Sequence, residues 1–290
     1  MDRWKVIGLL LLAVLASGCG ESQGQGIVVS ELSVEPSSIR AGRPVSVNMQ
    51  VVNAGMLKGS INVGDPSTGD AILTNHCPDY FSVQDFSASS TRDSGSQKTY
   101  TVGKGEVARF FWRLNQDKPD EIPLQGYTCN MKFEVPFNYS VRAYKQIQVK
   151  RSRNVSGTPK LATDISPGPL SIDMKIIGST AARKNTIIRG DNASLYLTAY
   201  NQEKDESAYQ GLININDIRI NGGGAISVGE SCGKRDSVTL VSGNQEIYRC
   251  DIDYSELTAP SVRGEIEVQI DYTFVKQVGE RKVKVKYVGQ

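Results

Sequence analysis

The sequence has little of what most catalytic and metal sites require. It contains one histidine, His76, two tryptophans and five cysteines among 290 residues, so no site that needs two histidines can form. Neither sign of charge is in excess, because 33 basic and 31 acidic residues leave a formal net charge of +2. The chain has no global positive field, and we expect no nucleic-acid partner. A hydrophobic content of 39% argues against intrinsic disorder, and the length suits about two domains.

Helical spacing of apolar residues is also missing from the body of the chain. Apolar and polar residues instead alternate in several segments, which predicts strands with one buried and one solvated face. The predicted fold class is therefore all-β, with antiparallel sheets and with Trp112 in the core. The alternating segments are residues 45–52, 108–114, 129–137, 194–198, 266–272 and 283–287.

The first 18 residues have the parts of a secretory signal. Arg3 and Lys5 precede an apolar run, residues 6–16, and small residues follow it. At about 1.5 Å per residue, this run covers only about half of a hydrocarbon core roughly 30 Å thick, which favours a cleaved signal over a transmembrane helix. We therefore predict that residues 1–18 are removed on export.

The end of this segment resembles the lipobox of lipoproteins. Ser17 and Gly18 are small residues that precede Cys19, although Ala16 stands where the family usually has Leu. The resemblance implies lipidation of Cys19 as the new first residue, and a location outside the cytoplasm, anchored to the cytoplasmic membrane or cell envelope. Ordinary cleavage near Cys19 is the alternative, but it would leave an odd free thiol. Residues 19–26 are then a flexible tether.

The remaining chain divides into two halves of similar length. Residues 151–167 are rich in Pro, Gly and Ser and are predicted to be a linker between residues 27–150 and 168–290. The halves resemble each other near their ends, where FEVPFNYSVRAYKQIQV matches IEVQIDYTFVKQVGERKVKV and Tyr139 aligns with Tyr272. This order of matches favours an internal duplication over chance similarity of strands.

A turn and strand near the start of the first half carry a family resemblance. Residues 36–42, PSSIRAG, lead into a strand that closes on residues 51–55, VVNAG. This pattern resembles the tandem immunoglobulin-like domains of bacterial and archaeal surface proteins, including the CARDB-type adhesion-related family. In the second half the closing motif is replaced by residues 200–202, YNQ. The resemblance implies two tandem immunoglobulin-like β-sandwiches that act as binding or spacer modules without catalytic residues.

Four cysteines remain besides Cys19, two in each half. Pairing within the halves predicts the disulfides Cys77–Cys129 and Cys232–Cys250, and export makes disulfides chemically reasonable. Metal binding is the alternative, but the chain has no Cys-x-x-Cys motif. We therefore expect two disulfides, no metal and no other cofactor.

Residues 64–104 form the predicted contact surface, because they read as long loops rich in Ser, Thr, Gly and Tyr. Tyr80, Phe81 and Phe86 are the aromatic side chains that would contact a partner there. The alternative is that these three rings pack a small core beneath the loop. The partner expected at this surface is a surface protein or a glycan.

Three Asn-x-Ser sequons, at Asn138, Asn154 and Asn192, are possible glycosylation sites in an exported chain. Only Asn154, in the linker, is clearly placed for access. Use of the sequons also depends on whether the organism glycosylates exported proteins.

The last alternating segment carries Lys282, Lys284 and Lys286 between Val283 and Val285. Lysines along an exposed strand commonly protect a sheet edge from pairing with other chains, and this is the favoured interpretation. Contact with nucleic acid or lipid is the alternative.

No set of residues has the spacing of a catalytic site. We therefore predict a non-enzymatic, membrane-anchored extracytoplasmic lipoprotein that acts as a binding, adhesion or assembly module, attached to the membrane by the lipid on Cys19. A structural spacer, or an accessory subunit of a cell-surface filament or envelope complex, is the alternative. An envelope glycan hydrolase would need paired carboxylates, and no such pair stands out.

Overall fold

The computed structural model describes most of residues 26–287. The residues left out of the description within this range are 56, 153–162, 166–167, 179–184, 191, 202–211, 230–237, 241–243 and 255–258. Cys19, Asn154 and Cys232 therefore lie outside the described residues.

The described residues form an all-β sandwich fold, as the alternation of the sequence predicts, with a single short 3-10 turn (Pro119–Glu121). The strands are β1 (Ile27–Glu35), β2 (Ser38–Arg40), β3 (Val45–Asn53), β4 (Gly59–Asn62), β5 (Leu73–Asn75), β6 (Phe81–Ser90), β7 (Thr99–Val102), β8 (Val107–Gln116), β9 (Tyr127–Lys150), β10 (Thr163–Ile165), β11 (Leu170–Gly178), β12 (Thr186–Ile188), β13 (Ala193–Asn201), β14 (Leu212–Gly224), β15 (Ile226–Val228), β16 (Val238–Leu240), β17 (Asn244–Tyr254) and β18 (Ser261–Lys286).

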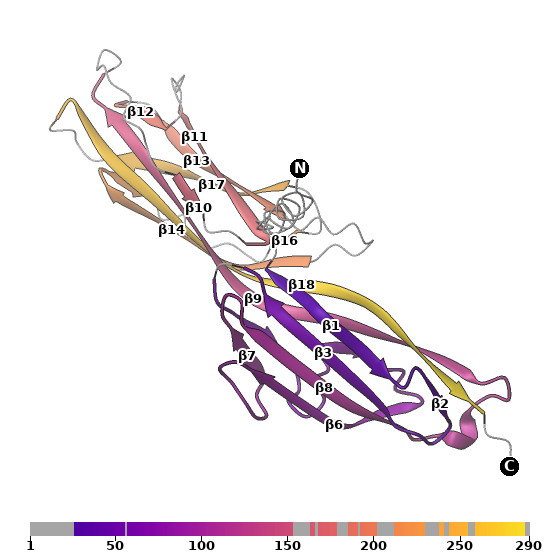
Figure 1. Cartoon of the computed structure of the whole chain (residues 1–290). Helices are drawn as coiled ribbons and strands as arrows, with labels where there is room; N and C mark the ends of the chain where they lie inside the picture. Colours follow the sequence, from indigo (N-terminus) through magenta and orange to yellow (C-terminus); the bar gives the residue numbers. More distant parts are fainter. Residues whose placement is uncertain are drawn as a thin grey trace, which may run out of the picture.

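Two four-stranded antiparallel sheets have the same strand order. Sheet A runs β1-β3-β8-β6, and sheet C runs β11-β13-β17-β15. Sheet A lies in the lobe that contains the C-terminus, and sheet C lies in the other lobe (Figure 1). Both sheets pack against a ten-stranded sheet, sheet B, which contains β9 and β18 at its centre. The two halves of the chain thus repeat one arrangement of strands.

Strands β9 and β18 are the longest of the described strands and pass through both lobes (Figure 1). They pair antiparallel from Tyr127 opposite Val285 to Lys150 opposite Ser261. The end of β9 also pairs with β12, from the second half, and the end of β18 pairs with β2, from the first half. Each half therefore contributes the end of its last strand to the sheet of the other half.

This exchange differs from the simple tandem arrangement expected from the sequence. The expected boundary at Lys150 falls at the tip of β9, where the strand already lies beside β12 of the second half. Within the expected linker, residues 163–165 form β10 and pair with β9. Residues 27–150 and 168–290 consequently share sheet B instead of closing two separate sandwiches.

Tyr139 and Tyr272, the two residues aligned by the internal similarity, are direct partners across β9 and β18. Their ring centroids are 5.9 Å apart, and both side chains are buried. The hydroxyl of Tyr139 donates a hydrogen bond to the carbonyl of Leu57 at 3.1 Å. Since corresponding residues of antiparallel strands meet here, the approximate two-fold axis between the halves passes through this tyrosine pair.

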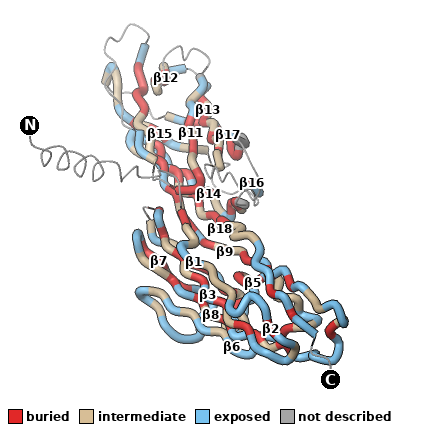
Figure 2. Tube along the Cα trace, turned by 45° about the vertical axis from the view of Figure 1, so that its right-hand side comes forward, coloured by how far each residue is buried: buried red, intermediate tan, exposed pale blue. Residues whose placement is uncertain are grey.

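A β-bulge keeps the core face of β18 buried along its length. Tyr272 and Phe274 face the core in the first part of the strand, whereas Val283 and Val285 face it near the end. The register shifts between Gln277 and Gly279, and Gly279 adopts a φ of 92° that glycine tolerates best. Without the extra residue, the polar side of β18 would turn inward in the lobe that contains sheet A. Figure 2 shows buried residues following β9 and β18 from one lobe into the other.

The disulfide predicted between Cys77 and Cys129 is present and joins the loop before β6 to the start of β9. The amide of Cys77 donates to Oδ1 of Asn75 at 2.9 Å, and this hydrogen bond shapes the turn that carries Cys77. Cys250, on β17, is also disulfide-bonded and is 4% exposed. Trp112 is fully buried, as expected, and its indole donates to the carbonyl of Thr68 at 2.8 Å.

Candidate functional site

Of the three aromatic residues expected to contact a partner, Phe81 is buried, and Tyr80 and Phe86 are half-buried and pack against the core. Phe81 is 1% exposed and belongs to the core. The ring of Tyr80 lies 4.3 Å from that of Tyr127, and the ring of Phe86 lies 5.2 Å from that of Trp112. The predicted contact surface is therefore wrong at Phe81, and the alternative of a small core beneath the loop describes all three rings.

These rings face inward because residues 81–90, which the sequence predicts as loop, form strand β6. Its register against β8 shifts between Val83 and Asp85. The extra residue lets both Phe81 and Phe86 face inward although they are five positions apart, and it turns Ser87 and Ser89 outward. The polar residues that suggested a loop are thus the outer face of an edge strand.

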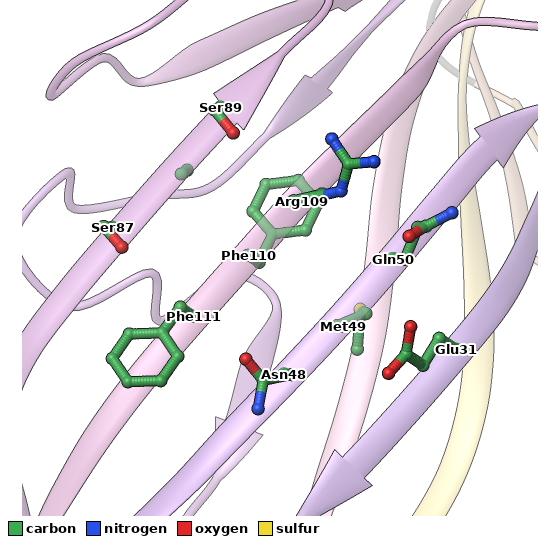
Figure 3. A pocket seen from close by; sticks show the side chains of 10 residues that line it. Glu31, Asn48, Met49, Gln50, Ser87, Ser89, Arg109, Phe110 and Phe111 are labelled. Atoms are coloured by element: carbon green, nitrogen blue, oxygen red, sulfur yellow. The ribbon is translucent and has the colours of Figure 1, made fainter.

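The outer face of sheet A contains an open hollow with a volume of about 350 Å³ (Figure 3). All four strands of the sheet contribute to it. Its lining residues are Glu31, Asn48, Met49, Gln50, Ser87, Ala88, Ser89, Arg109, Phe110 and Phe111.

Strand alternation explains why these side chains face outward. Met49 and Phe110 point toward the core, so Gln50 and Arg109, their neighbours in sequence, point to the outer face. Gln50 and Arg109 are direct cross-strand partners, with Ser89 beyond Arg109 on β6. One row of polar side chains therefore crosses the sheet, and Glu31 extends it on β1.

A second row contains an aromatic ring. Phe111 lies directly between Asn48 on β3 and Ser87 on β6. It is half-buried although it stands on the polar side of β8 (Figure 3). The hollow thus combines one aromatic ring with amide, hydroxyl, guanidinium and carboxylate groups.

These polar groups are not engaged with one another. Within the described part of the chain, the side chains of Glu31, Asn48, Gln50 and Arg109 make no hydrogen bond or ion pair. An arginine offers five donors, and an amide offers both donors and acceptors. The face of sheet A therefore presents free hydrogen-bonding groups of both kinds.

The corresponding outer face of sheet C is internally paired. The guanidinium of Arg249 lies 5.1 Å from the ring centre of Tyr196, its direct cross-strand partner. The hydroxyl of Ser194 donates to Asp251 at 2.9 Å, and Lys175 pairs with Asp173 at 3.3 Å. The same strand arrangement thus carries a face on which these polar groups bind each other.

A third polar surface lies where the two halves meet, in a hollow of about 550 Å³ over β4, β9, β14 and β18. Asp271 accepts hydrogen bonds from Ser140 at 2.5 Å and from Gln269 at 3.2 Å, and it also pairs with Arg219. Burial opposes ionisation of Asp271, but the hydrogen bonds from Ser140 and Gln269 and the charge of Arg219 outweigh it and lower its pKa. This network connects both halves and satisfies its own charges.

Two of the expected glycosylation sites lie on the described surface. Asn138 is exposed in the hollow between the halves, where its Oδ1 accepts a hydrogen bond from Thr273 at 2.9 Å. Asn192 is exposed just before β13. A glycan on Nδ2 of Asn138 would therefore lie beside a hydrogen bond between the two long strands.

Comparisons with known proteins give no family. No family model matches the sequence, and no curated protein matches it. Trypsin-activated alpha-2-macroglobulin from Escherichia coli is one of the solved structures that match, with 10% sequence identity and a TM-score of 0.25. The match covers 89% of this chain and 18% of that chain, so this protein spans about a fifth of its length. A TM-score this low does not establish a shared fold.

The described residues contain no helix long and apolar enough to cross a membrane. The disulfide between Cys77 and Cys129 is consistent with a location outside the cytoplasm.

Proposed function

We propose that the protein is a non-enzymatic, membrane-anchored lipoprotein outside the cytoplasm that binds a surface glycan on the outer face of sheet A. The observation that carries this proposal is the set of unengaged polar groups around Phe111. Sugars present hydroxyl groups that need both donors and acceptors, together with apolar C–H faces that pack on aromatic rings. Gln50, Asn48 and Arg109 beside Phe111 supply these partners.

The shape of the hollow also suits a glycan. It is open and extends across all four strands, so a chain of sugars could lie over it without entering a closed cavity. Its volume is within the range of about 300 to 1,000 Å³ that is typical of small-ligand sites. These features favour binding of a segment of a longer glycan.

The chemistry of the hollow favours binding over hydrolysis. Most glycoside hydrolases act with two carboxyl groups on either side of the scissile bond. Glu31 is the only carboxylate among the residues that line the hollow. The proposed role is therefore recognition and adhesion.

The anchor is proposed from Cys19 and the lipobox-like residues before it. Mass spectrometry of the protein extracted from membranes would detect an acylated peptide that begins at Cys19. A Cys19→Ser variant should then appear in the soluble fraction. A wild-type protein that carries no acyl group would overturn the anchor but would leave the glycan site to be tested separately.

A structural spacer or accessory subunit is the second candidate, favoured by the ribbon of β9 and β18. This ribbon runs through both lobes, so the lobes share one continuous sheet and do not depend on a flexible linker. The outer strand β6 offers an edge to which a partner could add a strand. Stoichiometric co-purification of one partner, undiminished by changes at Phe111, would favour this second function.

The glycan proposal is tested with an array of microbial surface glycans and the full mature chain. A Phe111→Ala variant should lose the glycans that the wild type retains. Tyr196→Ala, on the self-paired face of sheet C, is the matched control and should bind like the wild type. Equal binding by all three proteins, or no binding to any glycan, would remove sheet A as the site.

A further inference from the structure

A row of positive charge lies at the end of β18, on the outer face of sheet B. Lys282, Lys284 and Lys286 are all exposed there, while Val283 and Val285 between them are buried. Strand β2 adds Arg40, which lies directly beside Lys286 and is also exposed. Four basic side chains therefore share one face of one tip of the molecule.

Lys284 and Lys286 do not stand on a free sheet edge, whereas protection of an edge is the role that the sequence alone favours for the three lysines. Lys284 lies between Thr128 of β9 and Ser38 of β2 in the register of sheet B. The amide of Lys284 donates to the carbonyl of Ser37 at 2.9 Å, and the amide of Ala41 donates to the carbonyl of Lys286 at 3.1 Å. The backbone at Lys284 and Lys286 is already paired with β2, so the positive row needs another explanation.

The charges of this row also lack internal partners. In the residues that the structure describes, Arg40, Lys282, Lys284 and Lys286 form no ion pair or side-chain hydrogen bond. The nearby carboxylate of Glu280 pairs with Lys132 at 3.4 Å. Like charges at this spacing repel one another, and screening by salt reduces the repulsion without removing it. A concentration of unpaired charge in a chain with a net charge of +2 indicates an external anion.

The spacing of the row points to the shape of this anion. Side chains two positions apart on one strand face are separated by roughly 7 Å, so the three lysines present charges at regular intervals along a line of roughly 14 Å. The hollows described on sheet A and on sheet B do not include these side chains. A linear polymer with repeated negative charges matches this arrangement.

We propose that the end of β18, with Arg40, binds a linear acidic polysaccharide. The choice of a polysaccharide over other polyanions rests on the proposed location outside the cytoplasm, whereas the positive row itself does not depend on that location. The row lies on sheet B, so it is separate from the hollow on the outer face of sheet A. The protein would then hold an acidic polymer on sheet B and the surface glycan proposed above on sheet A, both in the lobe that contains the C-terminus.

Binding of the full mature chain to fluorescently labelled heparin, a sulfated linear polysaccharide, tests this proposal by anisotropy at low and at moderate salt. The variant Lys282→Gln/Lys284→Gln/Lys286→Gln should lose on the order of tenfold or more in affinity at low salt and should show a weaker salt dependence. Uncharged dextran should not bind. A matched control, Lys98→Gln/Lys104→Gln/Lys175→Gln, removes the same charge from exposed positions away from β2 and the end of β18 and should stay within about twofold of the wild type.

Each other result would overturn the proposal. Equal losses in both triple variants would show that binding follows total charge and not the row on β18. Tighter binding to anionic lipid vesicles or to a single-stranded oligonucleotide, at the same salt concentration, would assign the row to a different class of partner. Phe111→Ala should leave heparin binding unchanged, so the row and the hollow on sheet A can fail independently.

Discussion

The outer faces of sheets A and C have the same strand order, yet they differ in what their side chains contact. On sheet C, Arg249 lies over Tyr196 and Ser194 donates to Asp251. On sheet A, Arg109 and Gln50 are direct cross-strand partners and neither side chain makes a hydrogen bond or ion pair within the described residues. Polar groups that bind each other stabilise a face, whereas unengaged groups remain available to a ligand. The pairing of polar residues therefore distinguishes the two faces better than their composition does.

The largest expected effect concerns the stability of the lobe that contains sheet A. Besides its backbone pairing and its packing on the core, the lobe that contains sheet A is stabilised by the Cys77–Cys129 disulfide, which closes a separation of 52 residues. Replacing both cysteines by serine should lower the free energy of unfolding by about 4 kcal/mol on the chain-entropy model. Urea unfolding followed by the fluorescence of Trp112, the only tryptophan after residue 18, would measure this. An unchanged midpoint would show that packing alone supports the lobe.

The second effect concerns binding. Arg109→Ala should weaken the retained glycan by about tenfold or more, because it removes donors at the centre of the hollow. Arg249→Ala on sheet C should leave affinity unchanged and instead destabilise the fold slightly, since it breaks the contact with Tyr196. Isothermal titration calorimetry of both variants would compare the faces directly. Similar losses of affinity in the two variants would contradict the assignment of the site to sheet A.

The sequence predicts the inward and outward sides of strands well and their partners poorly. Alternation correctly places Phe110 and Trp112 in the core, and the same alternation puts Phe111 outward, which is the sequence signal for the hollow. Tyr80, Phe81 and Phe86 are poorly placed by the sequence, because the bulge that turns β6 inward at Phe86 depends on its pairing with β8. Local polarity cannot reveal such a bulge.

The exchange of strand ends between the halves is also set by non-local pairing, which the local sequence does not reveal. The internal similarity aligns Tyr139 with Tyr272, but only the structure shows that these residues face each other. Which strand pairs with β9 beyond Tyr139 is decided by non-local packing, and alternation is identical whichever partner is chosen. The sequence therefore predicts the strands of each half but not their connection through sheet B.

A third prediction extends the comparison to the paired network between the halves. Asp271→Asn should destabilise the protein by about 1 to 2 kcal/mol at neutral pH, because Arg219 and Ser140 lose a charged acceptor. The pKa of Asp271 in the folded protein is below the ordinary value of 3.8, so its contribution is complete above that value and is lost as the pH falls toward the folded-state pKa. Urea unfolding at pH 7 and at pH 3 would measure both effects.

The control for this network is Asp253→Asn, which alters an exposed carboxylate on β17 that makes no hydrogen bond or ion pair among the described residues. It should change stability by less than about 0.5 kcal/mol. If the two variants lost the same amount at pH 7, or if the loss at Asp271 were as large at pH 3, the ionised network would not contribute to the stability of the contact between the halves.

The variant with the smallest expected change in stability gives the outer face of sheet A a pair like the one on sheet C. In Gln50→Tyr, the new ring lies directly opposite Arg109 on β8, as Tyr196 lies opposite Arg249 on β17. The guanidinium of Arg109 can then pack on the ring, which should stabilise the fold by about 0.5 to 1 kcal/mol, while glycan binding is lost because the ring holds the guanidinium in place and covers the surface that the sugar would contact. Gln50→Leu is the matched control: it also removes the amide but leaves Arg109 free, so it should bind more tightly than Gln50→Tyr and should lack the added stability. If Gln50→Tyr bound glycan as well as the wild type, the availability of Arg109 would not be what separates sheet A from sheet C.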